Sequence, residues 1–251
     1  SYLSSYMHNH PDICFFGEPY NPEEVFSSVP LNPKETMLNV KWRDNHEKEF
    51  LKNLWNQDRP EKVLGLKMPI SSHKEALNTA LQDKTVAKIL LERKNLVRQY
   101  VSWQIAQKTA QWRLSDPEDR IKKSLTINIE LLKQYIKQST KKFVLLKKAL
   151  TESNQEYLQL FYEDIFGPKK EEYLEKALSF VGVEPIQDLD AHLKKQNPEP
   201  LSELVQNFDE LENDFKDTDK SWMLYGDEYS IGTKSIQIKK TTQKWKKYAV
   251  M

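Results

Sequence analysis

Four short apolar runs, separated by stretches with helical periodicity, limit most strongly what this chain can fold into. The runs lie at residues 13–16, 63–68, 86–91 and 157–162. Each is continuous and short, as in a strand that is buried on both faces. Helical spacing of apolar residues lies between or after them, at 45–57, 74–82, 93–112 and 171–181. Strands that alternate with helices predict an α/β fold, with three α/β/α layers around a central, mostly parallel sheet.

The remaining segments are less regular. Residues 20–44 contain three prolines and little periodicity, which predicts a long loop with one helical turn. A helix is predicted from about residue 116 toward residue 150, because Ile121, Leu125 and Ile129 share one face. We expect one domain at 1–225 and a basic extension at 226–251. In that extension residues 231–239 can fold back, and residues 239–248 form a surface helix or a disordered tail.

Composition narrows the class of protein. Lysine and arginine (38) nearly balance aspartate and glutamate (37), so net charge gives no support for a nucleic-acid partner. Cys14 is the only cysteine, which excludes an internal disulfide. No run approaches the roughly 20 apolar residues that cross a bilayer, and no signal peptide opens the sequence. We therefore expect a cytoplasmic protein without an integral membrane segment.

Ligands of parallel α/β sheets collect at the carboxyl ends of the strands. Glu18, Lys67 and Arg93 each stand at or just after such an end. Arg93 and Ser102 place a cation and a hydroxyl at a strand-to-helix junction, where a phosphate can bind with help from the helix N-terminus. On chemistry alone, the favoured interpretation is that Arg93 is a solvated helix residue and that Ser102 packs inside.

The segment from Arg93 to Trp112 resembles the 3′-phosphate-binding segment of sulfotransferases. The resemblance is closest to the type that contains trehalose and Nod-factor or lipopolysaccharide sulfotransferases, and it covers about residues 1–225. Other stretches agree with that family in their order along the chain: His10-Pro11-Asp12, Gly17-Glu18-Pro19-Tyr20-Asn21, Gly65-Leu66-Lys67, Tyr162-Glu163-Asp164-Ile165, Leu178-Ser179-Phe180-Val181-Gly182-Val183, Pro200-Leu201-Ser202-Glu203 and Asn207-Phe208-Asp209-Glu210.

The resemblance implies a fold related to P-loop nucleotide-binding proteins and an activity. A sulfuryl group would move from 3′-phosphoadenylyl sulfate (PAPS) to an acceptor hydroxyl, leaving 3′-phosphoadenosine 5′-phosphate (PAP), with no metal. Arg93 and Ser102 would hold the 3′-phosphate. The acceptor would be a carbohydrate or a glycolipid. The family also implies a first strand and a phosphosulfate loop before the first helix; Ser1 stands where that loop ends, and the rest is missing from this sequence.

The other candidates have competing interpretations. Glu18 is the candidate general base for the acceptor hydroxyl, or the first residue of an exposed turn. Lys67 can neutralise the donor's leaving phosphate, or extend from a sheet edge. His10 can line the acceptor pocket, or simply end a helix beside Pro11.

Lys194 and Lys195 can close over the 3′-phosphate, or lie in a solvated loop. His8 and His10 are too few for a metal site. Two rival functions stay open: a P-loop small-molecule kinase, which would need magnesium, and a non-catalytic interaction protein that keeps the fold.

Overall fold

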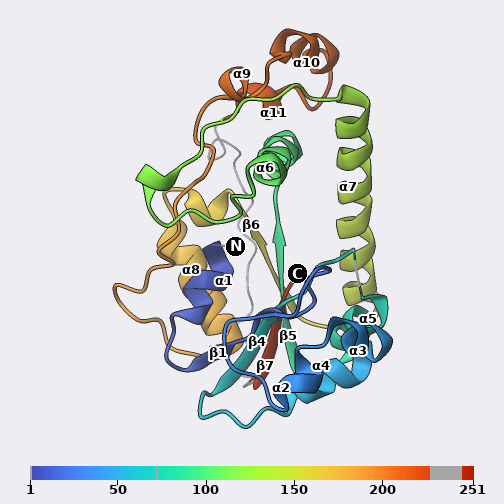
Figure 1. Ribbon diagram of the computed structural model, residues 1–251, viewed down its shortest axis with the longest axis vertical. Coiled ribbons are helices and arrows are strands. Elements are labelled where there is room, and N and C mark those ends of the chain that lie inside the picture. Colours follow the sequence, from blue (N-terminus) through green and yellow to red (C-terminus); the bar gives the residue numbers. More distant parts are fainter. Residues whose placement is uncertain (1, 72, 227–244) are drawn as a thin grey trace.

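A parallel sheet forms the centre of the computed structural model, which describes residues 2–71, 73–226 and 245–251 (Figure 1). Its five strands are all parallel and lie in the order β1 (Ile13–Phe15), β4 (Val63–Lys67), β7 (Lys247–Val250), β5 (Val86–Glu92) and β6 (Tyr157–Phe161). Four of these strands coincide with the four apolar runs. The α/β fold with a central parallel sheet is thus confirmed.

Helices cover both faces of the sheet, as Figure 1 shows. On one face lie α1 (Tyr2–His8) and α8 (Lys170–Val181), which ends at Gly182 in a left-handed conformation as the sequence predicted. On the other lie α4 (Glu47–Trp55), α5 (Lys74–Gln82) and the last turns of α7 (Ile129–Glu152). Successive strand residues point to opposite faces of the sheet. Tyr248 and Val250 therefore pack in the core beneath α1 and α8, and Ala249 packs in the core beneath α4, α5 and α7.

Residues 247–248 were predicted within a surface helix or disordered tail at 239–248, and the structure places them in the central strand β7 instead. Trp245 and Tyr248 are buried, and β7 pairs with both β4 and β5. Gly65 makes this pairing possible, because a Cβ there would lie 2.1 Å from the Tyr248 ring. The short apolar run that starts at Tyr248 follows two lysines, and for this reason the sequence did not predict a buried strand there. The predicted return of 231–239 lies outside the described residues.

The resemblance implied a strand before α1. In the structure, the centre of the sheet is occupied by β7, from the carboxyl-terminal part of the sequence. Met251 continues the β7 ladder: its backbone N–H donates to Ile89 O at 2.9 Å, and Leu91 N donates to its carbonyl at 2.8 Å. The carboxyl end of the central strand therefore reaches the same sheet edge as the ends of β4 and β5. The central strand is thus the last strand of the sequence.

The long helix is shorter than predicted. A 3₁₀ turn occupies Pro117–Asp119 (η1), and α7 begins only at Ile129, capped by the Asn128 side chain. The reason lies at Leu125, whose backbone bridges to the segment of Val205 through hydrogen bonds at both its N–H and its carbonyl. An extended backbone at that point cannot continue a helix.

A third group of helices sits beyond the carboxyl edge of the sheet, at the top of Figure 1. Helix α6 (Leu96–Thr109) and the first turns of α7 share an apolar cluster with α9 (Leu201–Leu204), α10 (Phe208–Phe215) and α11 (Trp222–Tyr225). Residues 20–44, predicted as a loop with one turn, contain β3 (Phe26–Ser27), α2 (Lys34–Met37) and most of α3 (Val40–Asn45). Strand β3 forms a hairpin with β2 (Gly17–Glu18). In the described parts of the chain, no helix combines the length and apolar character needed to span a bilayer.

Candidate functional site

A cavity of about 1180 Å³ opens at the carboxyl ends of the strands. Lys67 comes from the end of β4, Arg93 from the residue after β5, and Tyr162 from the residue after β6. Most of the site residues predicted from the sequence line this one cavity: Glu18, Lys67, Arg93, Ser102, Lys194 and Lys195. The structure thus brings together residues that lie far apart in the sequence.

One side of the cavity, here called the basic wall, consists of Arg93, Arg98, Ser102, Lys194 and Lys195. The Arg93 guanidinium lies 4.2 Å from the centre of the Tyr162 ring. This arrangement follows from the register of the sheet. Glu92 and Phe161 are paired, so the residues that follow them, Arg93 and Tyr162, lie side by side at the cavity. Stacking on an aromatic face holds a guanidinium in place while its N–H edge can still bind an oxyanion.

Glu163 fixes the turn that carries Arg93. Its carboxylate is 4% exposed and accepts hydrogen bonds from the backbone N–H groups of Lys94 and Asn95, at 2.9–3.1 Å. Burial raises the pKa of Glu163, although these backbone donors and Arg93 act in the opposite direction. Glu163 therefore binds the two amides that precede α6, and the Asn95 side chain accepts from Arg98 N inside its first turn. The help of the helix N-terminus in phosphate binding stays a prediction.

Helix α6 also anchors the segment that bears Lys194 and Lys195. Asn197 Nδ2 donates to Ser102 Oγ at 3.1 Å, and Arg98 Nη2 donates to the Glu199 carbonyl at 2.9 Å. The Ser102 hydroxyl accepts in this contact, so its own proton is available to an anion in the cavity. Ser102 thus both supports the basic wall and faces the cavity.

A second part of the lining, here called the hairpin wall, is built on β2, β3 and their connecting loop, with Glu18, Glu23, Glu24 and Phe26. Lys67 Nζ donates to Glu18 Oε1 at 2.7 Å. Burial raises the pKa of Glu18, but the charge and hydrogen bond of Lys67 outweigh it, and the pKa lies below its usual value of 4.5. Glu18 is therefore a carboxylate at neutral pH, available to accept a proton.

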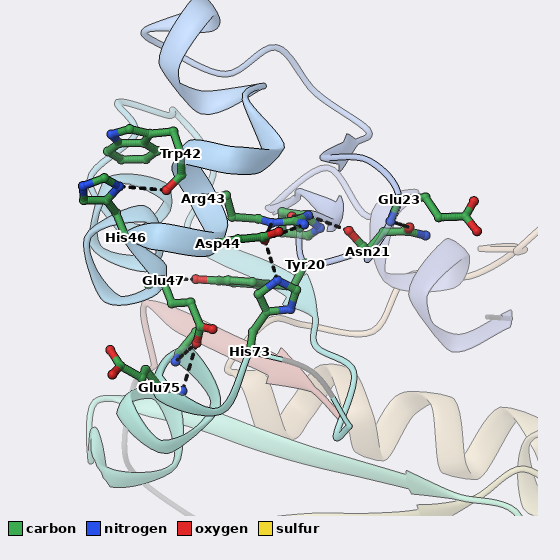
Figure 2. Close-up of polar contacts among 12 residues, drawn as sticks. Tyr20, Asn21, Glu23, Trp42, Arg43, Asp44, His46, Glu47, His73 and Glu75 are labelled. Atoms are coloured by element: carbon green, nitrogen blue, oxygen red, sulfur yellow. Dashed lines mark hydrogen bonds and ion pairs between the residues drawn. The ribbon is translucent and has the colours of Figure 1, made fainter.

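A buried arginine holds the loop of this hairpin (Figure 2). Arg43 is fully buried, and its Nη1 donates to the carbonyls of Pro19, Asn21 and Glu24. Its charge is balanced by Asp44, with 2.8 Å between Arg43 Nη2 and Asp44 Oδ1. A rigid guanidinium with several donors suits such a cluster of carbonyls better than a lysine would. Arg43 thus positions a loop that lines the cavity without itself being among the lining residues.

Asp44 is shared with a second element. His73 Nε2 lies 2.9 Å from Asp44 Oδ1, and the His73 ring lies 5.0 Å from the ring of Tyr20. Figure 2 shows these side chains stacked beneath the Arg43 guanidinium. The cluster therefore ties α3 and the start of α5 to the hairpin wall.

Two predicted residues do not join the site. His10 does not line the cavity: it is 2% exposed, accepts from Asp12 N through Nδ1, and lies 2.9 Å from the Glu184 carbonyl through Nε2. Both ring nitrogens are used, so His10 is a buried structural histidine and not an acceptor ligand. Ser1 lies outside the described residues.

Arg43 escaped the sequence analysis, and Glu163 was quoted there within the family pattern Tyr162-Glu163-Asp164-Ile165. Glu163 carried a detectable signal, because it is a carboxylate directly after a buried strand. Arg43 carried none, since it sits in a proline-rich region without clear periodicity. Trp112 was seen only as part of the family pattern, although its indole lines the cavity.

Comparison with protein-family models, curated proteins and solved structures found no match for this chain. Among the residues that the structure describes, no group of three or more His, Cys, Asp or Glu side chains is placed to hold a metal ion. The function must therefore be inferred from the cavity and its two walls.

Proposed function

We propose that this protein is a sulfotransferase that moves a sulfuryl group from PAPS to an acceptor hydroxyl. The observation that carries the proposal is that Arg93, Ser102, Lys194 and Lys195 line the same cavity as the Glu18–Lys67 pair. One cavity thus offers cationic and hydroxyl groups for an anionic donor together with a carboxylate for an acceptor hydroxyl.

The basic wall would bind the donor. Arg93 supplies a planar guanidinium for the 3′-phosphate, and Ser102 supplies a hydroxyl one to three helical turns further along α6. Lys194 and Lys195 add positive charge from the anchored segment. A cavity of about 1180 Å³ has room for a nucleotide together with an acceptor.

Glu18 would act as the general base. As the acceptor oxygen bonds to sulfur, its proton passes to the Glu18 carboxylate, and the bond between sulfur and the donor's phosphate oxygen breaks. The leaving phosphate keeps the electron pair of that bond and departs as part of PAP. Lys67 holds Glu18 in place and stands beside the reaction as a cation, which favours charge that builds up on the transferring oxygens. A carbohydrate or glycolipid acceptor follows from the resemblance alone.

The test is calorimetric titration with PAP. We expect micromolar binding by the wild-type protein and at least tenfold weaker binding by Arg93→Ala, which is about 1.4 kcal/mol. Arg59→Ala is the matched control, since Arg59 is not among the lining residues and contacts the carbonyl of Pro30. It should bind PAP as the wild type does.

Titration with ATP and magnesium separates the rival functions. Tighter binding of ATP with magnesium than of PAP would favour the kinase alternative and refute the proposal. If a folded protein binds neither nucleotide, the donor assignment is wrong and the interaction-protein alternative gains support.

A further inference from the structure

The outer side of α7 is exposed along its length. Leu132 and Ile136 pack in the cluster that α7 shares with α6. Leu146 and Leu150 pack in the core that it shares with α4 and α5. At 3.6 residues per turn these four residues lie on one side of the helix, and Lys141 lies on the opposite side. Helix α7 runs along one side of the molecule in Figure 1, so the side that carries Lys141 faces solvent.

Two aliphatic side chains stand among lysines on this outer side. Val144 is 55% exposed and Leu145 is 54% exposed, and neither belongs to a hydrophobic cluster of the described residues. Lys141 lies three and four positions before this pair and Lys148 lies four and three positions after it, so the side chains are neighbours on the helix surface. Lys137 extends the row by one more turn. These five residues are here called the α7 ridge.

Positive charge is concentrated on α7. The helix has six lysines and two glutamates, whereas the net charge of the whole chain is only +1. Its ion pairs involve Lys133, Lys147 and Lys148. Among the described residues, no such pair involves Lys137 or Lys141. The ridge therefore has cationic groups that can contact an anionic partner.

Charge, aliphatic side chains and shape together decide which partner fits. An acidic helix would need a groove to lie in, and the ridge is the convex surface of a helix. A nucleic acid would gain from aromatic side chains that stack on its bases, and the exposed pair is aliphatic. A second copy of the chain would bring lysines against lysines. A layer of anionic lipid headgroups with apolar chains just below it matches all three features.

We propose that the α7 ridge docks the protein on a membrane surface that contains anionic phospholipids. The lysines would contact lipid phosphates, while Val144 and Leu145 enter the boundary between headgroups and acyl chains. Lysine suits this arrangement, because its aliphatic stem can lie along the apolar layer while its ammonium group stays among the headgroups. The helix would lie along the surface, since six lysines are costly in hydrocarbon. The inference is independent of the sulfotransferase proposal, because no ridge residue lines the cavity.

The test is co-sedimentation of the full chain with two kinds of vesicle: phosphatidylcholine alone, and equal parts phosphatidylcholine and phosphatidylglycerol. We expect at least tenfold tighter binding to the anionic vesicles. Raising the salt concentration from about 0.05 M to about 0.5 M should weaken that binding at least tenfold, because salt screens the lysine charges. The double variant Val144→Ser, Leu145→Ser should weaken it at least threefold and keep the salt dependence.

Neutralising the ridge lysines tests the charge. The triple variant Lys137→Gln, Lys141→Gln, Lys148→Gln should bind anionic vesicles at least tenfold more weakly. The matched control is Lys41→Gln, Lys52→Gln, Lys74→Gln, which removes the same charge from exposed positions on α3, α4 and α5. The control should weaken binding less than threefold. All of these side chains are exposed, so an unchanged Tm will show that each variant is folded.

The outcomes are distinct. Equal binding to both kinds of vesicle, or binding to neither, would refute the docking inference and leave the sulfotransferase proposal untouched. An equal loss in the ridge variant and its control would show that only net charge matters, which also refutes it. Tighter binding to double-stranded DNA or to polyglutamate than to anionic vesicles would give the ridge a different partner.

Discussion

The two walls of the cavity are positioned by different means. The hairpin wall depends on the buried Arg43, which binds three carbonyls of one short loop. In the basic wall, the buried Glu163 fixes the turn of Arg93. The segment of Lys194 and Lys195, by contrast, is joined to α6 through partly exposed contacts such as the one from Asn197 to Ser102. A buried charged group with several hydrogen bonds is costly to disturb, whereas a partly exposed neutral contact is not.

This difference agrees with what each wall would have to do. A bound anion with several phosphate oxygens can itself draw cationic side chains into position, because each contact is charge-assisted. A general base has no such help, since the acceptor hydroxyl is neutral and forms weaker contacts. The carboxylate side therefore needs to be positioned before the substrate arrives, and Arg43 supplies that.

Replacing Arg43 should give the largest effect and would break the hairpin wall. Arg43→Met leaves the carbonyls of Pro19, Asn21 and Glu24 without this donor and removes the arginine partner of Asp44. We expect a loss of about 3 kcal/mol in the free energy of unfolding, or a fall in Tm of roughly 6–12 °C. Calorimetry or denaturant titration measures both.

Arg59→Met is the control for the loss of an arginine, because Arg59 makes an exposed contact to a single carbonyl. It should cost less than about 1 kcal/mol. Hydrogen exchange would localise the effect, with faster exchange of residues 19–26 in Arg43→Met and little change in the sheet. Equal losses for both variants would show that Arg43 is not a special support of this wall.

The second prediction concerns the charge of Glu18. In Lys67→Met, burial acts on Glu18 without its main opposing cation, so the pKa of Glu18 should rise from below 4.5 to above it. If Glu18 is the base, the acid limb of the pH–rate profile should move up by about one pH unit or more. Lys62→Met, which breaks the exposed pair with Asp12, should leave the profile in place.

The contribution of Glu18 to the free energy of unfolding should depend on pH in opposite directions in the wild type and in Lys67→Met. In the wild type, the lowered pKa of Glu18 stabilises the folded protein above the unfolded pKa, and this contribution is lost as pH falls through the folded pKa. In Lys67→Met, the raised pKa gives a contribution that is present at acid pH and lost as pH rises. Denaturant titrations from pH 7 down to about pH 2 would cover both transitions, and an unchanged acid limb would contradict the role given to Lys67.

The sequence was informative about site residues that lie at the ends of predicted strands. Arg93, Lys67 and Glu18 were predicted because ligands gather at the carboxyl ends of parallel strands, and the structure brings all three to one cavity. The sequence was uninformative where position depends on distant contacts. Arg43 acts through carbonyls about twenty residues away, and carbonyls have no sequence signature.

Two errors have a common physical cause. His10 looked like a pocket residue, and residues 239–248 looked like a polar tail, because local composition does not show which surface a segment meets. The core that buries Tyr248 forms around Gly65, and the carbonyl that accepts from His10 belongs to Glu184. Both contacts join parts of the chain separated by more than 150 residues, a range over which periodicity carries no information.

The smallest predicted effect would sharpen the description of the basic wall. Ser102→Ala removes a hydroxyl that accepts from Asn197 and is available to donate to a phosphate, whereas Asn197→Ala removes only the internal contact. We expect Ser102→Ala to weaken PAP binding about fivefold, or about 1 kcal/mol, and Asn197→Ala less than twofold. Parallel calorimetric titrations compare them. If the two variants weaken binding equally, Ser102 serves only to anchor the segment of Lys194 and Lys195, and Arg93 would be the single strong phosphate ligand on α6's side of the cavity.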